Sequence, residues 1–174
     1  THPQAIRAWR EALKRAPLAH FAWQGIADAA LAYTPEQYGE QPANNRLREA
    51  GAINAYLTAG HDDERAVALA TLARAYEAAQ NWKRAIRAYR ESLDLAEMAD
   101  VRASLDAVVA AHGFRIVDNS VDNNAASPRI CLNFSDALSS QLTSSENAGD
   151  FVQVEGGETL PVTASGSQIC IEDR

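Results

Sequence analysis

The chain has 174 residues, and its 16 Lys and Arg against 23 Asp and Glu give a net charge of −7. This balance argues against a protein that binds the phosphate backbone of nucleic acids, because such a protein needs a basic face. Although 47% of the residues are hydrophobic, no apolar run approaches the roughly 20 residues that cross a bilayer, so we expect a buried core and no membrane span.

The composition changes along the chain. Thirty of the 35 alanines lie in residues 1–112, whereas residues 113–174 are rich in Val, Ile, Ser, Asn and Gly. Because Ala favours helices and β-branched residues favour strands, we expect a helical domain over 1–112 and a β domain over 113–174, an α+β fold. The acidic charge is concentrated in the second part, which has 3 basic and 9 acidic residues. Gly113 is expected to end the last helix in the left-handed conformation.

The first predicted helix covers residues 4–17, where apolar residues recur at helical spacing and Pro17 ends the helix. Four of its residues match residues 80 positions later: Ala5, Ile6, Trp9 and Leu13 correspond to Ala85, Ile86, Tyr89 and Leu93. This self-similarity without gaps indicates a repeat.

The next helical pair is degenerate. Its first helix carries Trp23, Ile26 and Ala27, and its second carries Ala52, Ile53, Tyr56 and Ala59. The connection from Tyr33 to Asn45 is thirteen residues long and contains two prolines and a glycine, so we expect it to be a loop.

Residues 66–97 carry the clearest repeat. The apolar positions of its two predicted helices are Leu69, Leu72, Ala73 and Tyr76, then Ala85, Ile86, Tyr89, Ser92 and Leu93, with Asn81 and Trp82 at the turn. This pattern resembles the tetratricopeptide repeat, and the step of 33 residues from Ala52 to Ala85 is close to its length of about 34. The resemblance implies a stack of helical hairpins, and we expect a last helix over Val101–Ala111 that Asp100 caps.

In such stacks the first helix of each pair usually lines a concave face. Here that face would include Val67, Ala70, Arg74 and Glu77. It could hold a peptide or another protein domain, or the helical domain could be a spacer packed against its own chain. The sequence leaves both interpretations open.

Five short strands are predicted in the second part, separated by turns rich in Asn, Ser and Gly. They cover Phe114–Val121, Arg129–Ser135, Phe151–Glu155, Leu160–Ala164 and Gln168–Glu172. Their spacing is typical of a β-sandwich. A two-sheet sandwich of about 100 residues usually has seven strands, so we expect an incomplete one, in which either the chain stops inside the domain or strands have been lost.

Both cysteines, Cys131 and Cys170, fall on the polar face of their predicted strands. Directly opposite residues on neighbouring antiparallel strands lie about 4.5–5.5 Å apart, which suits a disulfide. We therefore expect a disulfide and an oxidising compartment, which in a bacterium is the periplasm or beyond. Two reduced thiols in a cytosolic protein are the alternative. Because no signal segment follows Thr1, we expect a piece of a longer protein whose targeting information lies elsewhere.

Three segments of the β part resemble one family. They read DNNAASPRICLNFSDAL over Asp122–Leu138, FVQVEG over Phe151–Gly156 and QICIE over Gln168–Glu172. Their order resembles the opening immunoglobulin-like macroglobulin domain of the bacterial alpha-2-macroglobulin family, some members of which carry helical repeats upstream. The resemblance implies a large envelope protein in which a protease cuts a bait segment, the molecule rearranges and a thioester can tether the protease. This chain has no recognisable bait and no Cys followed shortly by Glu-Gln, so the trapping chemistry is absent from these residues.

Other motifs for chemistry are missing from the sequence. The four histidines are scattered, and there is no Cys-x-x-Cys, glycine-rich phosphate loop or Gly-x-Ser-x-Gly. We therefore expect no metal, no cofactor and no catalytic residue. The expected function is a non-catalytic N-terminal scaffold of an envelope protease inhibitor, whose partners are the other domains of the parent chain and, through them, target proteases. The alternatives are an independent peptide-binding repeat module with an accessory β domain, and an enzyme whose site the sequence does not reveal.

Overall fold

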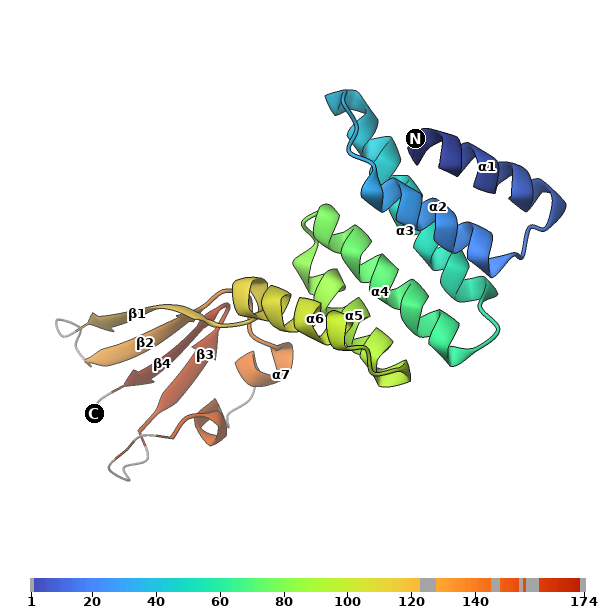
Figure 1. Cartoon of the computed structure of the whole chain (residues 1–174). Coiled ribbons are helices and arrows are strands. Elements are labelled where there is room, and N and C mark those ends of the chain that lie inside the picture. The colour runs from blue at the N-terminus through green and yellow to red at the C-terminus, as the bar shows by residue number, and fades with distance from the viewer. Residues whose placement is uncertain (1, 123–127, 145–147, 154, 156–159, 173–174) are drawn as a thin grey trace. The chain divides into compact units, whose positions relative to one another are not determined.

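Figure 1 shows a computed structural model of the chain, which describes residues 2–122, 128–144, 148–153, 155 and 160–172. The chain divides into two compact units, Thr1–Gly113 and Phe114–Arg174. The first unit is helical, and the second contains an antiparallel sheet. The α+β class predicted from composition is confirmed.

The helices of the first unit follow one another along the chain, and each α-helix packs against the next. They are α1 (His2–Arg15), α2 (His20–Ala32), η1 (Tyr38–Glu40, a 3₁₀ helix), α3 (Gln41–Thr58), α4 (Asp62–Ala78), α5 (Trp82–Leu95) and α6 (Ala99–His112). Between neighbouring helices the chain turns within a few residues, as in a series of helical hairpins.

Two sequence predictions about the helix ends are wrong. The expected loop from Tyr33 to Asn45 is shorter, since α3 begins at Gln41 and takes Pro42 into its first turn, where a missing N–H costs no helical hydrogen bond. Asp100 does not cap α6, because Met98 stands at the N-cap position and Asp100 lies in the first turn.

Gly113 is extended, with φ −70° and ψ 166°, rather than left-handed. The position needs glycine for another reason, since a Cβ there would collide with the carbonyl oxygen of Val109. Its N–H donates to the same oxygen at 2.8 Å and so closes the end of α6.

The main core of the helical unit lies between α4, α5 and α6. Its buried residues are Ala70, Ala73, Ala88, Tyr89, Val101, Leu105 and Val108. The alanines allow the helix backbones to approach closely, and Tyr89 is the largest side chain that the core encloses completely. Trp82 closes one side of the core and stacks on His112, with ring centroids 3.7 Å apart.

Helices α2 and α3 are in close contact at Gly51. A Cβ on Gly51 would lie 2.9 Å from the backbone nitrogen and 3.0 Å from the Cβ of Ala27. We expect Gly51→Ala to lower the free energy of unfolding by about 1–2 kcal/mol in urea titrations, because the cost of overpacking exceeds the gain in helix propensity. Gly39→Ala is the control, since no atom lies within 4 Å of a Cβ there. Equal stability of the two variants would contradict the close contact.

The second unit is built on a four-stranded antiparallel sheet with the order β1-β2-β4-β3. Its strands are β1 (Ile116–Asp122), β2 (Arg129–Phe134), β3 (Val162–Ser165) and β4 (Gln168–Glu172), and α7 (Ser140–Thr143) and η2 (Ala148–Phe151) lie between β2 and β3. Gly166, at φ +58°, begins the two-residue turn from β3 to β4, a position where glycine carries no steric cost.

The strand predicted over Phe151–Glu155 is wrong for its described residues. Phe151 ends η2, and Val152 and Gln153 belong to no strand, while Val154 lies outside the described residues. The other four predicted strands are confirmed within two residues of their expected bounds.

The two central strands present different faces. Ile130 is paired with Ile171 and Leu132 with Ile169, so one face is apolar. On the other face Cys131 is paired with Cys170, and the Gln168 amide donates to Asn133 at 2.9 Å. The cysteines are joined by a disulfide, as the sequence predicts. Their expected exposure on the polar face is wrong, because they are only 4% and 7% exposed.

Candidate functional site

The four α4 residues predicted to line a binding face differ in their environment. Val67 is 43% exposed, whereas Ala70 is 2% exposed and belongs to the main core. The prediction that Ala70 lines a surface is therefore wrong. Helix α4 packs against α3, α5 and α2, so the side of the helix that carries Ala70 is covered.

Arg74 and Glu77 both bind groups of other helices. Arg74 Nη2 lies 3.1 Å from Asp100 Oδ2 on α6. Glu77 Oε2 accepts a hydrogen bond of 2.7 Å from the hydroxyl of Tyr89 on α5. Both residues therefore connect helices within the unit, and a ligand of either would compete with these bonds.

A polar side chain of α2 also forms a hydrogen bond with α4. Gln24 donates to Asp28 at 3.0 Å and to the buried hydroxyl of Thr71 on α4 at 2.7 Å. Burial raises the pKa of Asp28, and the hydrogen bond from Gln24 and the charge of Arg74 oppose this shift. We call Gln24, Asp28, Thr71, Arg74 and Asp100 the polar row.

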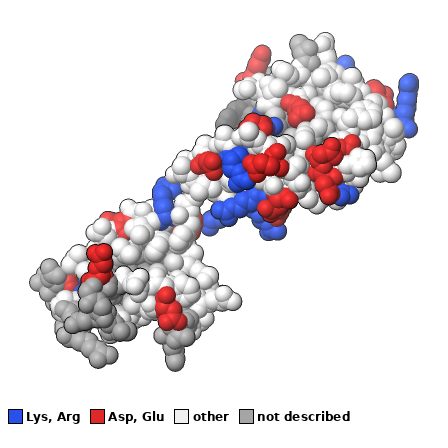
Figure 2. All heavy atoms as spheres, turned by 60° about the horizontal axis from the view of Figure 1, so that its bottom comes forward, with Lys and Arg blue, Asp and Glu red and all other residues white. Residues whose placement is uncertain are grey.

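One acceptor of the polar row has no partner. Oε1 of Gln24 is buried and has no hydrogen bond within the described part of the chain. The positive charge of Arg74 lies between the negative charges of Asp28 and Asp100. Figure 2 shows the same mixture over the helical unit, where blue and red side chains lie interspersed on the visible face. A ligand with a single strong charge finds no uniform field on this face.

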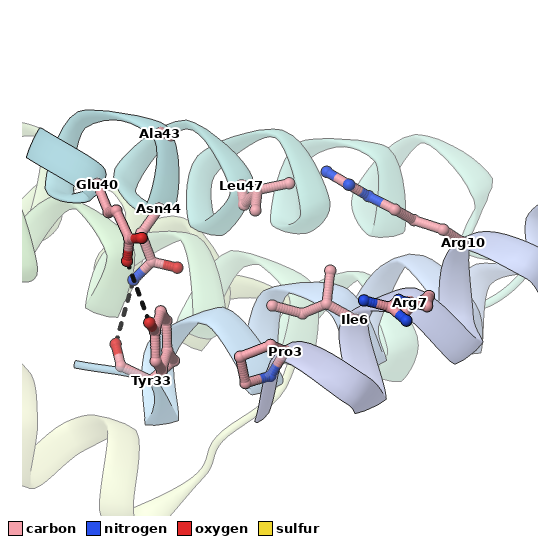
Figure 3. A pocket seen from close by; sticks show the side chains of 9 residues that line it. All are labelled: Pro3, Ile6, Arg7, Arg10, Tyr33, Glu40, Ala43, Asn44 and Leu47. Atoms are coloured by element: carbon pink, nitrogen blue, oxygen red, sulfur yellow. Dashed lines mark hydrogen bonds between the residues drawn. The ribbon is translucent and has the colours of Figure 1, made fainter. Parts of the chain in front are cut away.

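A groove that sequence reasoning missed lies between α1 and α3 (Figure 3). One cavity of this groove has a volume of about 450 Å³, and an adjoining cavity of about 470 Å³ shares Arg10 and Leu47 with it. We call the two together the α1–α3 groove. Its floor is a hydrophobic cluster in which Ile6 and Leu47 pack over Ala29 and Ala30 of α2.

Two buried residues of α3 fix the shape of this groove. Asn44 and Arg48 both donate hydrogen bonds to the carbonyl oxygens of Ala30 and Tyr33, at 2.9–3.1 Å. These oxygens belong to the end of α2, where carbonyls lack helical partners and the helix dipole attracts a cation. Arg48 is only 6% exposed, and burial lowers its pKa. These four hydrogen bonds fix the start of α3 against the end of α2 and so hold this side of the groove in place.

One cavity of the α1–α3 groove, the one drawn in Figure 3, carries opposite charges at its two ends. In Figure 3, Glu40 lies at the end near Tyr33, and Arg7 and Arg10 lie at the other end, with Ile6 and Leu47 between them. The Tyr33 hydroxyl donates to Glu40 at 3.2 Å. Neither Arg7 nor Arg10 has a hydrogen-bond or ion-pair partner in the part of the chain that the structure describes, whereas Lys14 on the same helix is paired with Glu11 at 2.7 Å.

Within the described residues, no group of three or more His, Cys, Asp or Glu side chains could hold a metal ion. The helices described for this chain include none of the length and apolarity that a membrane span requires. No protein-family model matches the chain, and a search among curated proteins finds no match.

Proposed function

We propose that this chain is a non-catalytic scaffold of an alpha-2-macroglobulin-like protease inhibitor of the bacterial cell envelope. In this proposal the helical unit is a tetratricopeptide-like stack, and the β unit is part of an immunoglobulin-like macroglobulin domain. The observation that carries the proposal is the disulfide between Cys131 and Cys170, because these are the cysteines of the segments that resemble the family.

The apolar face of the sheet supports an incomplete sandwich. Ile130 and Val121 are paired on neighbouring strands of this face, yet they are 49% and 58% exposed. In a sandwich a second sheet packs over such a face at about 10 Å. Further strands of a macroglobulin domain would bury these side chains and remove an apolar patch that is costly in water.

The disulfide also supports a place outside the cytosol. Disulfides persist in oxidising compartments and are rare where glutathione and thioredoxin keep thiols reduced. The β unit is small and cannot bury a large core. A disulfide stabilises such a unit, and an oxidising compartment such as the cell envelope allows the disulfide to form. On this proposal the partners are the other domains of the parent chain and the proteases that the parent traps.

The test is the gene sequence beyond the codon of Arg174, followed by an assay of the whole protein. We expect further sandwich domains, a bait segment and a Cys-Glu-Gln cluster. The whole protein, once cleaved by trypsin, should block digestion of casein while leaving hydrolysis of a small chromogenic peptide intact. A gene that ends at Arg174, or a whole protein that leaves casein digestion unchanged, would overturn the proposal.

A second candidate function is an independent peptide-binding module, favoured by the half-exposed Arg74 in the polar row and by Oε1 of Gln24, which has no hydrogen-bond partner among the residues described. On this function, the protein binds extended 12-residue peptides on an array saturably, and Arg74→Ala weakens binding several-fold because a cation facing the ligand is lost. Arg90→Ala on α5 is the control. Absence of saturable binding, or equal loss in both variants, excludes this function.

A further inference from the structure

The α1–α3 groove is used by neither of these functions. Residues of α1 from Pro3 to Lys14 line the two cavities that form it, a length of about three helical turns. Its floor is apolar and held by the packing of Ile6 and Leu47 on α2. A groove of this length with an apolar floor suits an amphipathic segment rather than a small polar molecule.

The charged side chains that line the groove determine which charge a bound segment should carry. Arg7 and Arg10 are exposed, one helical turn apart, and both line the cavity. Since neither has a partner within the described residues, both guanidinium groups are available for carboxylates. Glu40 at the opposite end repels a second acidic group there and would orient the ligand.

We propose that the α1–α3 groove binds an acidic amphipathic segment of a partner protein. Its carboxylates lie against Arg7 and Arg10, and its apolar side chains cover Ile6 and Leu47. Arginine suits this role because its planar fork can meet a carboxylate with two hydrogen bonds. Glu40 disfavours a nucleic acid, because phosphates recur along the whole length of such a ligand and some would lie against this carboxylate.

The test is fluorescence anisotropy with a labelled 15-residue helical peptide that has Leu along one face and Glu residues three and four positions apart at its edge. Matched peptides carry Gln or Lys in place of Glu. We expect saturable binding of the Glu peptide, at least tenfold weaker binding of the Gln peptide, and weaker binding in 500 mM than in 50 mM NaCl. Amide signals of Ile6, Ala43 and Leu47 should shift on binding.

The Arg7→Glu/Arg10→Glu variant should bind the Glu peptide at least tenfold more weakly and should gain binding of the Lys peptide. This gain keeps the test decisive, because a misfolded variant would bind neither peptide. The control is Arg15→Glu/Arg90→Glu, which makes the same change in net charge outside the groove and should bind the Glu peptide within about twofold of the unsubstituted chain.

Three results would overturn the inference. They are no binding of the Glu peptide, equal binding of the Glu and Gln peptides, and equal losses in the groove variant and the control variant. None of them bears on the alpha-2-macroglobulin proposal, which is tested by the gene and by protease protection. The two proposals therefore fail separately.

Discussion

Replacing Cys131 and Cys170 by alanine should lower the free energy of unfolding of the β unit by about 4 kcal/mol, through the chain entropy of the loop that the bond closes. The two residues are 39 positions apart and join the central strands β2 and β4. The β unit otherwise has few buried apolar side chains, since the described face around Val121 and Ile130 is open to solvent. We expect most molecules of the variant to have an unfolded β unit at 37 °C.

The positions of the tryptophans allow the stability of each unit to be measured separately. All three tryptophans, Trp9, Trp23 and Trp82, lie in the helical unit. Urea unfolding followed by tryptophan fluorescence should therefore be unchanged in the double variant, whereas the amide signals of β2 and β4 should lose their dispersion. Dithiothreitol should have the same effect on the unsubstituted chain and none on the variant. Intact β signals after complete reduction would contradict the dependence on the disulfide.

The helices with a regular apolar pattern could be predicted from sequence because a single interaction, the burial of one apolar face, determines their structure. Apolar residues such as Ile86 and Tyr89 recur at helical spacing, and burial of that stripe fixes the helix. The disulfide could be predicted because a strand places every second residue on one face, so Cys131 and Cys170 could meet once their strands paired.

The errors arise where several interactions compete. The segment from Phe151 has strand-like residues, but Phe151 itself is the last residue of the short helix η2, which packs against β3. Ala70 shares helix α4 with Val67, and only the packing of the neighbouring helices determines that one is buried and the other exposed. Gly113 needs glycine because of Val109, a contact that depends on the path of the chain after the helix.

The α1–α3 groove could not be predicted from sequence for a related reason. Its existence depends on α1 and α3 packing on α2 without closing on each other. The sequence contains a partial signal, since Arg7 and Arg10 stand next to Ile6 and Leu13 on a strongly amphipathic helix. The same signal also describes an ordinary solvated helix face, and only the cavity distinguishes the two.

Tyr89→Ala should destabilise the helical unit by about 3–5 kcal/mol, the range for removing a buried aromatic side chain. The ring is fully buried between α4, α5 and α6, and its hydroxyl donates to Glu77 at 2.7 Å. Tyr89→Phe keeps the ring and should cost about 2 kcal/mol, because a carboxylate loses its donor. Urea titrations followed by tryptophan fluorescence measure both losses. Tyr56→Phe, at an exposed tyrosine, should change little.

The same hydroxyl should make the stability of the helical unit sensitive to alkaline pH. Burial, aided by the hydrogen bond to Glu77 and its charge, raises the pKa of Tyr89 above the ordinary value of 10.0. Above that pH the unfolded chain releases the phenolic proton while the folded unit retains it, so stability present below pH 10 is lost as the pH rises. One such group contributes a slope of about 1.4 kcal/mol per pH unit. Urea titrations at pH 8 and at pH 11 measure this effect. Between these two pH values the free energy of unfolding should fall less for Tyr89→Phe than for the unsubstituted chain. Equal losses would mean that the folded unit releases this proton as readily as the unfolded chain does.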